Sequence, residues 1–351
     1  MSKKNKVIVG LMLAVSLLVA GKELYDAVAS LSADYPENDI NGYIAWGAGG
    51  ATDTISRVIT IYAQQELGTN IILQNKTGAS GGIATEFVYG LPADGYSLLF
   101  NAENPPLYGV MGISNVSYDD FYPVMLFGSQ VAVVVVGPDS PYQSITELLA
   151  DAAANPGAIR IGITGAGGLP FNVAAMIQGT SGVTFNQIPF DGDAAVSTAL
   201  MGGHVDVSVV NYSVAAELAQ AGKLKILTVM DNNRLSYIPE VEAIGEVLPE
   251  YQKYFPWGAF TGVFVDNRCS DKVKQTLTDA FRAAYESEGF QNYLSENYII
   301  PLGLSGTEAE QFITRWQSVS TWLLADAGAA EVSPAELGIP RLEELEGGQS
   351  E

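Results

Sequence analysis

The chain has 351 residues and a formal net charge of −22, from 17 Lys and Arg against 39 Asp and Glu. This acidic balance disfavours nucleic acid and anionic membrane surfaces as partners. The single cysteine, Cys269, allows no intrachain disulfide, and the single histidine, His204, removes most zinc sites and most Ser-His-Asp triads. We therefore expect no metal and no cofactor, and the length predicts two domains.

Residues 1–33 have the pattern of an export signal. Three lysines within the first six residues precede an apolar run over 7–20, which is of signal-peptide length and short for a membrane-spanning helix. Small residues at 27–29 offer one cleavage point, and an uncleaved anchor is the alternative. In either case we expect a periplasmic or other extracytoplasmic protein.

The first third of the chain after this segment alternates strands and helices. Strands are expected over 42–46, 70–74 and 97–100, and helices over 53–67 and 81–89. This βαβαβ order predicts an α/β fold with a mostly parallel sheet, and ligands of such sheets bind beyond the carboxyl ends of the strands.

The first connection in this pattern is a glycine loop. Gly47, Ala48, Gly49 and Gly50 lie between the first strand and a helix whose first turn carries Asp53. Glycines let the backbone approach a ligand, and the first N–H groups of a helix lack intrahelical partners, so the loop suits an anion. The spacing fits neither a Walker loop nor a dinucleotide fingerprint, and a tight strand-to-helix connection of an α/β domain is the alternative interpretation.

A carboxylate follows the third strand. Glu103 lies beside the expected anion site, where it repels negative charge. We expect a solvated loop residue, and the alternative is a contact to a ligand donor such as an amine or a hydroxyl.

The remaining chain repeats the alternation. Strands are expected over 131–136, 159–164, 184–189, 205–210, 224–230 and 255–265, and helices over 144–154, 172–178, 194–201, 215–221, 272–286, 290–297 and 307–327. Ser144, with Glu147 in a capping box, and Ser270 are expected helix caps. Cys269 is expected to be a surface thiol without a catalytic role, and residues after 331 a loose acidic tail.

A second glycine loop follows the strand over 159–164. Thr164, Gly165, Gly167 and Gly168 repeat the order of strand, glycines and helix start. Two such loops, one in each domain, are compatible with a grip on one anion from both sides of a cleft, and two independent turns are the alternative.

Further candidate ligand residues lie at later strand ends. Asn211 follows one of the expected strands, and Trp257 lies where the chain returns to the first domain. Asp191 and Asp193 are expected to be solvated residues at the start of the next helix rather than metal ligands.

Three motifs occur in the order found in one known family: Gly49-Gly50-x-x-Asp53-x-x-x-Arg57, then Asn75-x-x-Gly78-Ala79-x-Gly81, then Asp94-Gly95-Tyr96-x-Leu98-Leu99. The set resembles the substrate-binding subunits of tripartite tricarboxylate transporters (the Bug or TctC family), from about residue 35 onward.

The resemblance implies a type II periplasmic binding protein with a central cleft and two crossing hinge segments near 137 and 256. The implied division is a targeting segment over 1–33, domain one over 34–137 and 256–340, domain two over 138–255, and a tail over 341–351.

The implied function is capture of a small carboxylate for delivery to integral-membrane permease subunits, by a monomer without enzymatic activity. The alternatives are an orphan solute sensor and a hydrolase using Ser56 or Ser213, but no activated nucleophile is visible. Family members often carry a histidine where Leu169-Pro170-Phe171 stands here. The resemblance also implies that Phe190 and Gly192 border the ligand, with Phe190 standing where family members often carry a tyrosine. We therefore expect a partly apolar pocket for a mono- or dicarboxylate with an aromatic or amino group.

Overall fold

The computed structural model describes residues 35–255 and 257–347. The expected export signal, Pro256 and the last four residues lie outside this range. The chain divides into a unit up to Asn38 and a unit over Asp39–Glu351, and the description below concerns the second unit. Within the described residues, no helix is both long and apolar enough to cross a membrane.

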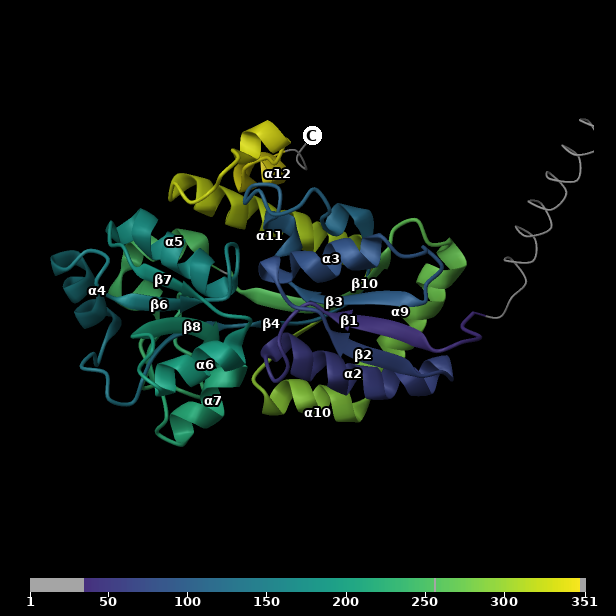
Figure 1. Ribbon diagram of the computed structural model, residues 1–351, viewed down its shortest axis with the longest axis horizontal. Helices are drawn as coiled ribbons and strands as arrows, with labels where there is room; N and C mark the ends of the chain where they lie inside the picture. The colour runs from purple at the N-terminus through teal and green to yellow at the C-terminus, as the bar shows by residue number, and fades with distance from the viewer. Residues whose placement is uncertain (1–34, 256, 348–351) are drawn as a thin grey trace, which may run out of the picture. The chain divides into compact units, whose positions relative to one another are not determined.

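The second unit contains two mixed β-sheets (Figure 1). The first sheet has the order β11-β4-β10-β3-β1-β2, and its strands are β1 (Ile40–Ile44), β2 (Ile71–Asn75), β3 (Ser97–Ala102), β4 (Phe121–Gln130), β10 (Ala259–Asp266) and β11 (Ile300–Leu304). β1 pairs in parallel with β2 and β3, as the βαβαβ pattern predicts, while β10 and β4 pair antiparallel. Its helices are α2 (Ala51–Leu67), α3 (Gly82–Tyr89), α9 (Asp271–Glu286), α10 (Glu288–Glu296), α11 (Gly306–Asp326) and α12 (Leu342–Gly347).

The second sheet has the order β7-β6-β8-β5-β9. Its strands are β5 (Ala132–Val136), β6 (Arg160–Ile163), β7 (Asn186–Pro189), β8 (Val207–Asn211) and β9 (Lys225–Val229), and its helices are α4 (Ile145–Ala154), α5 (Leu169–Ser181), α6 (Asp193–Met201), α7 (Tyr212–Gln220) and α8 (Ile244–Val247). All five residues of β5 are buried, as a continuous run of β-branched side chains predicts for a central strand.

The chain passes from the first sheet to the second at Val131, between β4 and β5. β5 pairs with β8 and β9, so the change of sheet precedes the boundary expected at 137. The difference arises because β4, an unpredicted strand, carries the chain across the first sheet immediately before β5. The domain boundaries themselves remain a prediction.

Two expectations about helix ends are confirmed, and one is wrong. The Oγ atoms of Ser144 and Ser270 accept hydrogen bonds from the N–H groups of Glu147 and Val273. The Glu147 carboxylate binds the N–H of Gln143 rather than that of Ser144, so the expected capping box does not form.

The expected loose tail and the expected surface thiol are both wrong. Ser318 Oγ and Trp322 Nε1 donate hydrogen bonds to the carbonyls of Pro340 and Ile339, and the Arg341 guanidinium lies 3.9 Å from the centre of the Trp322 ring. These contacts hold the segment after α11 against that helix. Cys269 is buried, and burial raises the pKa of its thiol to about 11.

α11 touches both parts of the unit. It packs against β4 of the first sheet and against α5 beside the second (Figure 1). The loops that face each other between the two sheets are therefore held in one compact unit.

Candidate functional site

A small pocket lies where loops from both sheets meet. The first sheet contributes residues before α2 and after β3, and the second contributes the ends of β6 and β8 and the start of α6. The lining residues are Trp46, Gly47, Gly50, Ala51, Thr52, Ala102, Glu103, Asn104, Thr164, Leu169, Gly192, Asp193 and Asn211. None of these described lining residues is a lysine or an arginine.

Four helices begin at this pocket. The cap residues of α2, α5, α6 and α7 are Gly50, Gly168, Gly192 and Asn211, and none of them makes a side-chain hydrogen bond to its helix. The first N–H group of α7, that of Tyr212, bonds to the Val131 carbonyl, whereas the first N–H groups of α2, α5 and α6 have no side-chain partner among the described residues. Each helix adds a partial positive charge. Together these termini create a local site for an anion in a chain of net charge −22.

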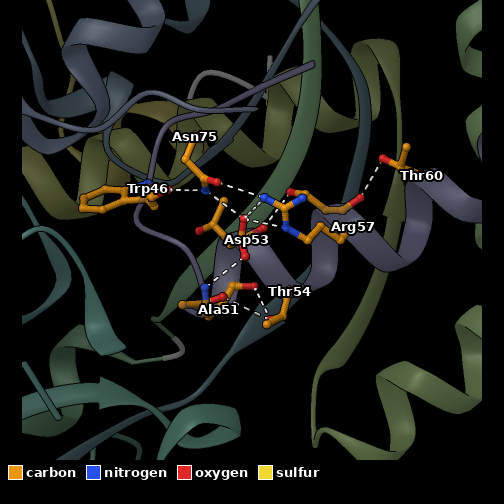
Figure 2. Close-up of polar contacts among 11 residues, drawn as sticks. Trp46, Ala51, Asp53, Thr54, Arg57, Thr60 and Asn75 are labelled. Atoms are coloured by element: carbon orange, nitrogen blue, oxygen red, sulfur yellow. Dashed lines mark hydrogen bonds and ion pairs between the residues drawn. The ribbon is translucent and has the colours of Figure 1, made fainter. Parts of the chain in front are cut away.

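The first glycine loop is fixed from within by Asp53 (Figure 2). The Asp53 carboxylate accepts hydrogen bonds from the Gly49 N–H at 3.0 Å, Arg57 Nε at 2.9 Å and Asn75 Nδ2 at 2.8 Å. Burial acts to raise its pKa, but these hydrogen bonds outweigh burial and hold the pKa below its ordinary value. Asp53 thus positions the loop and is not among the residues lining the pocket.

The second glycine loop is bound by side chains of the first-sheet region. Ser80 Oγ donates to the carbonyl of Ala166 at 2.5 Å, and Asn104 Nδ2 donates to the carbonyl of Gly167 at 2.6 Å. A Cβ atom on Gly165, whose φ is +88°, would lie 2.6 Å from Ser80 Oγ. Glycine suits this position because L side chains rarely adopt its positive φ and because Ser80 approaches so closely.

Two carboxyl groups face the pocket. Glu103 follows β3 and is 2% exposed, and Asp193 opens α6 and is half-buried. Burial raises the pKa of Glu103 to about 8, and the nearby charge of Asp193 adds to the rise. Burial likewise raises the pKa of Asp193 to about 6, against hydrogen bonds from Asn211. The expectation that both residues are solvated is wrong, because the loops of the other sheet cover them.

Three buried acceptor atoms of the lining have no hydrogen-bond partner among the residues that the structure describes. They are Glu103 Oε2, Asn104 Oδ1 and Asn211 Oδ1. A buried acceptor without a partner costs roughly 1–3 kcal/mol, so these atoms mark places for donor groups of a bound molecule or water.

The structure brings together six of the fourteen predicted site residues: Gly47, Gly50, Glu103, Thr164, Gly192 and Asn211. Gly165 and Phe190 line an adjoining open cavity, which shares Trp46 and Thr164 with the pocket. The remaining six line neither space: Ala48, Gly49, Asp53, Gly167, Gly168 and Trp257.

Trp257 lies in the core. Its Nε1 donates to Ser320 Oγ at 2.8 Å, and its ring stacks on that of Trp316. Sequence reasoning missed six lining residues, namely Trp46, Ala51, Thr52, Ala102, Asn104 and Asp193, and it expected Leu169 only as part of an apolar wall. Each of these residues adjoins a predicted site residue in the sequence, which is the only local signal that they carry.

Comparison with known proteins places this geometry in context. A family model described as "Tripartite tricarboxylate transporter family receptor" (TctC) matches residues 55–325. Protein BugT of Bordetella pertussis is 27% identical over 301 residues, which cover 83% of this chain and 91% of BugT.

Two solved structures share the fold. The periplasmic binding protein BugD aligns with a TM-score of 0.78 at 22% identity, covering 84% of this chain and 99% of BugD. Rpa4515 of R. palustris, solved with adipate, also aligns with a TM-score of 0.78 at 22% identity, covering 85% of this chain and 99% of Rpa4515. At this identity the likeness concerns the α/β two-domain periplasmic binding protein fold.

Proposed function

The chain belongs to the TctC family of tripartite tricarboxylate transporter receptors, which bind solutes and are not enzymes, and we propose that it captures a small carboxylate outside the cytoplasm and delivers it to integral-membrane permease subunits. The observation that carries the proposal is the meeting of four helix N-termini at one pocket whose described lining has no cationic side chain.

The chemistry of this lining suits one or two carboxylate groups. Backbone N–H groups at a helix start stabilise a carboxylate by charge-assisted hydrogen bonds, with ordered water completing its shell. Leu169 and Trp46 add apolar surface beside them. A ligand with three negative charges would lose much hydration in this pocket without a buried cation in return.

The family and the relative support this assignment. Rpa4515 was solved with adipate, a dicarboxylate, on the same fold. Residues 1–33 are proposed to export the chain, because a periplasmic location is the one in which such a receptor meets its solute.

Thermal-shift screening against mono-, di- and tricarboxylates tests the proposal. A true ligand at about 100 times its dissociation constant adds ~2.7 kcal/mol of stability. Calorimetry on each hit would then give its affinity. If no carboxylate stabilises the protein while neutral or cationic solutes do, the proposed function is wrong.

A further inference from the structure

Glu103 is the most unusual residue of the pocket. It is almost fully buried, it lines the pocket, and its Oε2 atom has no hydrogen-bond partner. The N–H groups of its own residue and of Phe260 favour its ionised form, but burial outweighs them. A side chain so placed is costly to the folded protein alone, and its free oxygen points to a donor supplied from outside.

Asp193 reinforces this feature from the other sheet. It opens α6, interacts electrostatically with Glu103, and receives a hydrogen bond from Asn211 Nδ2 at 3.3 Å. The other titratable groups that interact with Glu103 are the phenols of Tyr108 and Tyr118, which carry no positive charge. Among the described lining residues there is thus no cation to balance two carboxyl groups.

We propose that Glu103 and Asp193 form a subsite for an ammonium group, so that the ligand is an amino-bearing carboxylic acid. Its carboxylate would lie at the helix N-termini and its ammonium group between the two acids. Only the placement of the ligand carboxylate rests on the proposed function, and the placement of the ammonium group does not. The ammonium group supplies the donor that Glu103 Oε2 lacks and the charge that the lining lacks.

Binding of an ammonium group beside Glu103 changes the protonation of that carboxyl group. With a pKa near 8, Glu103 is mostly protonated at neutral pH before the ligand arrives. A cation beside it favours the ionised form and lowers its pKa, so binding releases a proton. Affinity for the amino acid therefore rises with pH between about 6 and 8, in the range where Glu103 and Asp193 ionise.

A competing arrangement makes the opposite prediction. A protonated Glu103 can instead donate a hydrogen bond to a ligand carboxylate. Affinity would then fall as pH rises, and Glu103→Gln, which keeps two N–H donors, would retain binding.

The test uses matched sets of acids that differ only in bearing hydrogen, hydroxyl or ammonium at one carbon, together with amines that lack a carboxyl group. Titration calorimetry is performed on the wild type, Glu103→Gln, Asp193→Asn and a control, Glu296→Gln, which lies exposed on α10. We expect an ammonium-bearing acid to bind at least about tenfold more tightly than its hydrogen counterpart, a difference of ~1.4 kcal/mol. Glu103→Gln and Asp193→Asn should each remove most of that preference, and Glu296→Gln should not.

The outcomes distinguish failure of the subsite, failure of the function and failure of both. Equal or tighter binding of the unsubstituted acids by the wild type, or affinity that falls with pH, rejects the ammonium subsite and leaves the carboxylate function standing. Binding of amines without a carboxyl group, lost in Glu103→Gln, together with no binding of acids, rejects the function and retains the subsite. Absence of binding throughout the panel counts against both.

Discussion

The Asp53 carboxylate closes the first glycine loop on itself by accepting a hydrogen bond of 3.0 Å from the Gly49 N–H. The same carboxylate pairs with Arg57 one turn along α2. One acidic side chain therefore fixes both the loop and the helix that begins from it, and Gly50 and Ala51 reach the pocket as a consequence.

Replacing Asp53 by asparagine should weaken the loop. We expect a loss of roughly 1–3 kcal/mol in the free energy of unfolding, since the Arg57 ion pair is lost and the buried hydrogen bonds weaken. The measurement is urea unfolding at pH 7, with Asp119→Asn, an exposed aspartate, as the control. An unchanged midpoint in Asp53→Asn would show that the loop is held by other contacts.

The Asp53–Arg57 ion pair makes the stability of the protein depend on pH. The pKa of Asp53 is lowered in the folded state, so its stabilising contribution is present above the ordinary aspartate pKa and is lost as pH falls through the folded value. The difference in unfolding free energy between wild type and Asp53→Asn should therefore shrink below about pH 4. A difference that stays constant down to pH 2 would contradict this role.

Gly50→Val should weaken binding at least about tenfold without unfolding the protein. Gly50 has an extended backbone, with φ of −80° and ψ of 173°, which valine adopts readily. The nearest atom to an added Cβ is the Gly47 carbonyl oxygen at 3.4 Å, so the branched side chain would project into the pocket rather than into the core. We expect affinity to fall at least about tenfold, or ~1.4 kcal/mol, by calorimetry. Gly90→Val, exposed at the end of α3, is the control. Full affinity in Gly50→Val would place the anion site elsewhere.

Ser80→Ala should shift the protein toward an open form. The Ser80 hydroxyl donates to the Ala166 carbonyl and so joins regions built on the two sheets. Losing one such bond, worth about 1 kcal/mol, changes the ratio of closed to open forms roughly fivefold. Small-angle scattering should show a larger radius of gyration for ligand-free Ser80→Ala than for wild type, and ligand should restore it. Ser295→Ala, exposed on α10, should scatter like wild type. Identical curves for Ser80→Ala would argue against hinge motion about Val131 and the segment near 257.

Trp257→Phe should reduce stability and leave binding unchanged. The substitution removes the hydrogen bond from Nε1 to Ser320 Oγ and leaves a buried hydroxyl without that partner. We expect a cost of roughly 1–3 kcal/mol in unfolding free energy. Affinity for the best carboxylate should stay within the error of calorimetry, because Trp257 lies outside the pocket. A loss of affinity in the folded Trp257→Phe variant would show that Trp257 belongs to the binding site.

The sequence predicts most elements of the fold because helix and strand periodicity is local. The sequence pattern does not predict β4 and β11, because each contains a proline and a glycine, which ordinarily mark turns. These residues are Pro123 and Gly128 in β4, and Pro301 and Gly303 in β11. Both strands are stabilised by pairing with distant strands, which no local pattern reveals.

The residues of the pocket also divide into those set by a local sequence pattern and those set by distant contacts. Gly47, Gly50 and Thr164 could be predicted because a strand end, a glycine and a helix start are adjacent in the chain. Asp193 could not, because its position in the pocket depends on α6 meeting a loop from the other sheet. Trp257 was placed in the pocket from its position at the return crossing, whereas α11 supplies a hydrogen-bonding hydroxyl that holds it in the core.

The four helix N-termini also govern how a ligand approaches. Their partial charges act over about one helix turn, whereas the chain as a whole carries a net charge of −22 that repels anions at long range. An anionic ligand therefore diffuses toward the protein against a barrier that salt screens, with a Debye length of about 10 Å at 0.1 M ionic strength. Association rate constants for dicarboxylates should rise with added salt, which is the reverse of electrostatic steering, while those for zwitterions of zero net charge should hardly change. At low ionic strength the zwitterion would therefore associate faster than the dicarboxylate, whatever the relative stabilities of the two bound complexes.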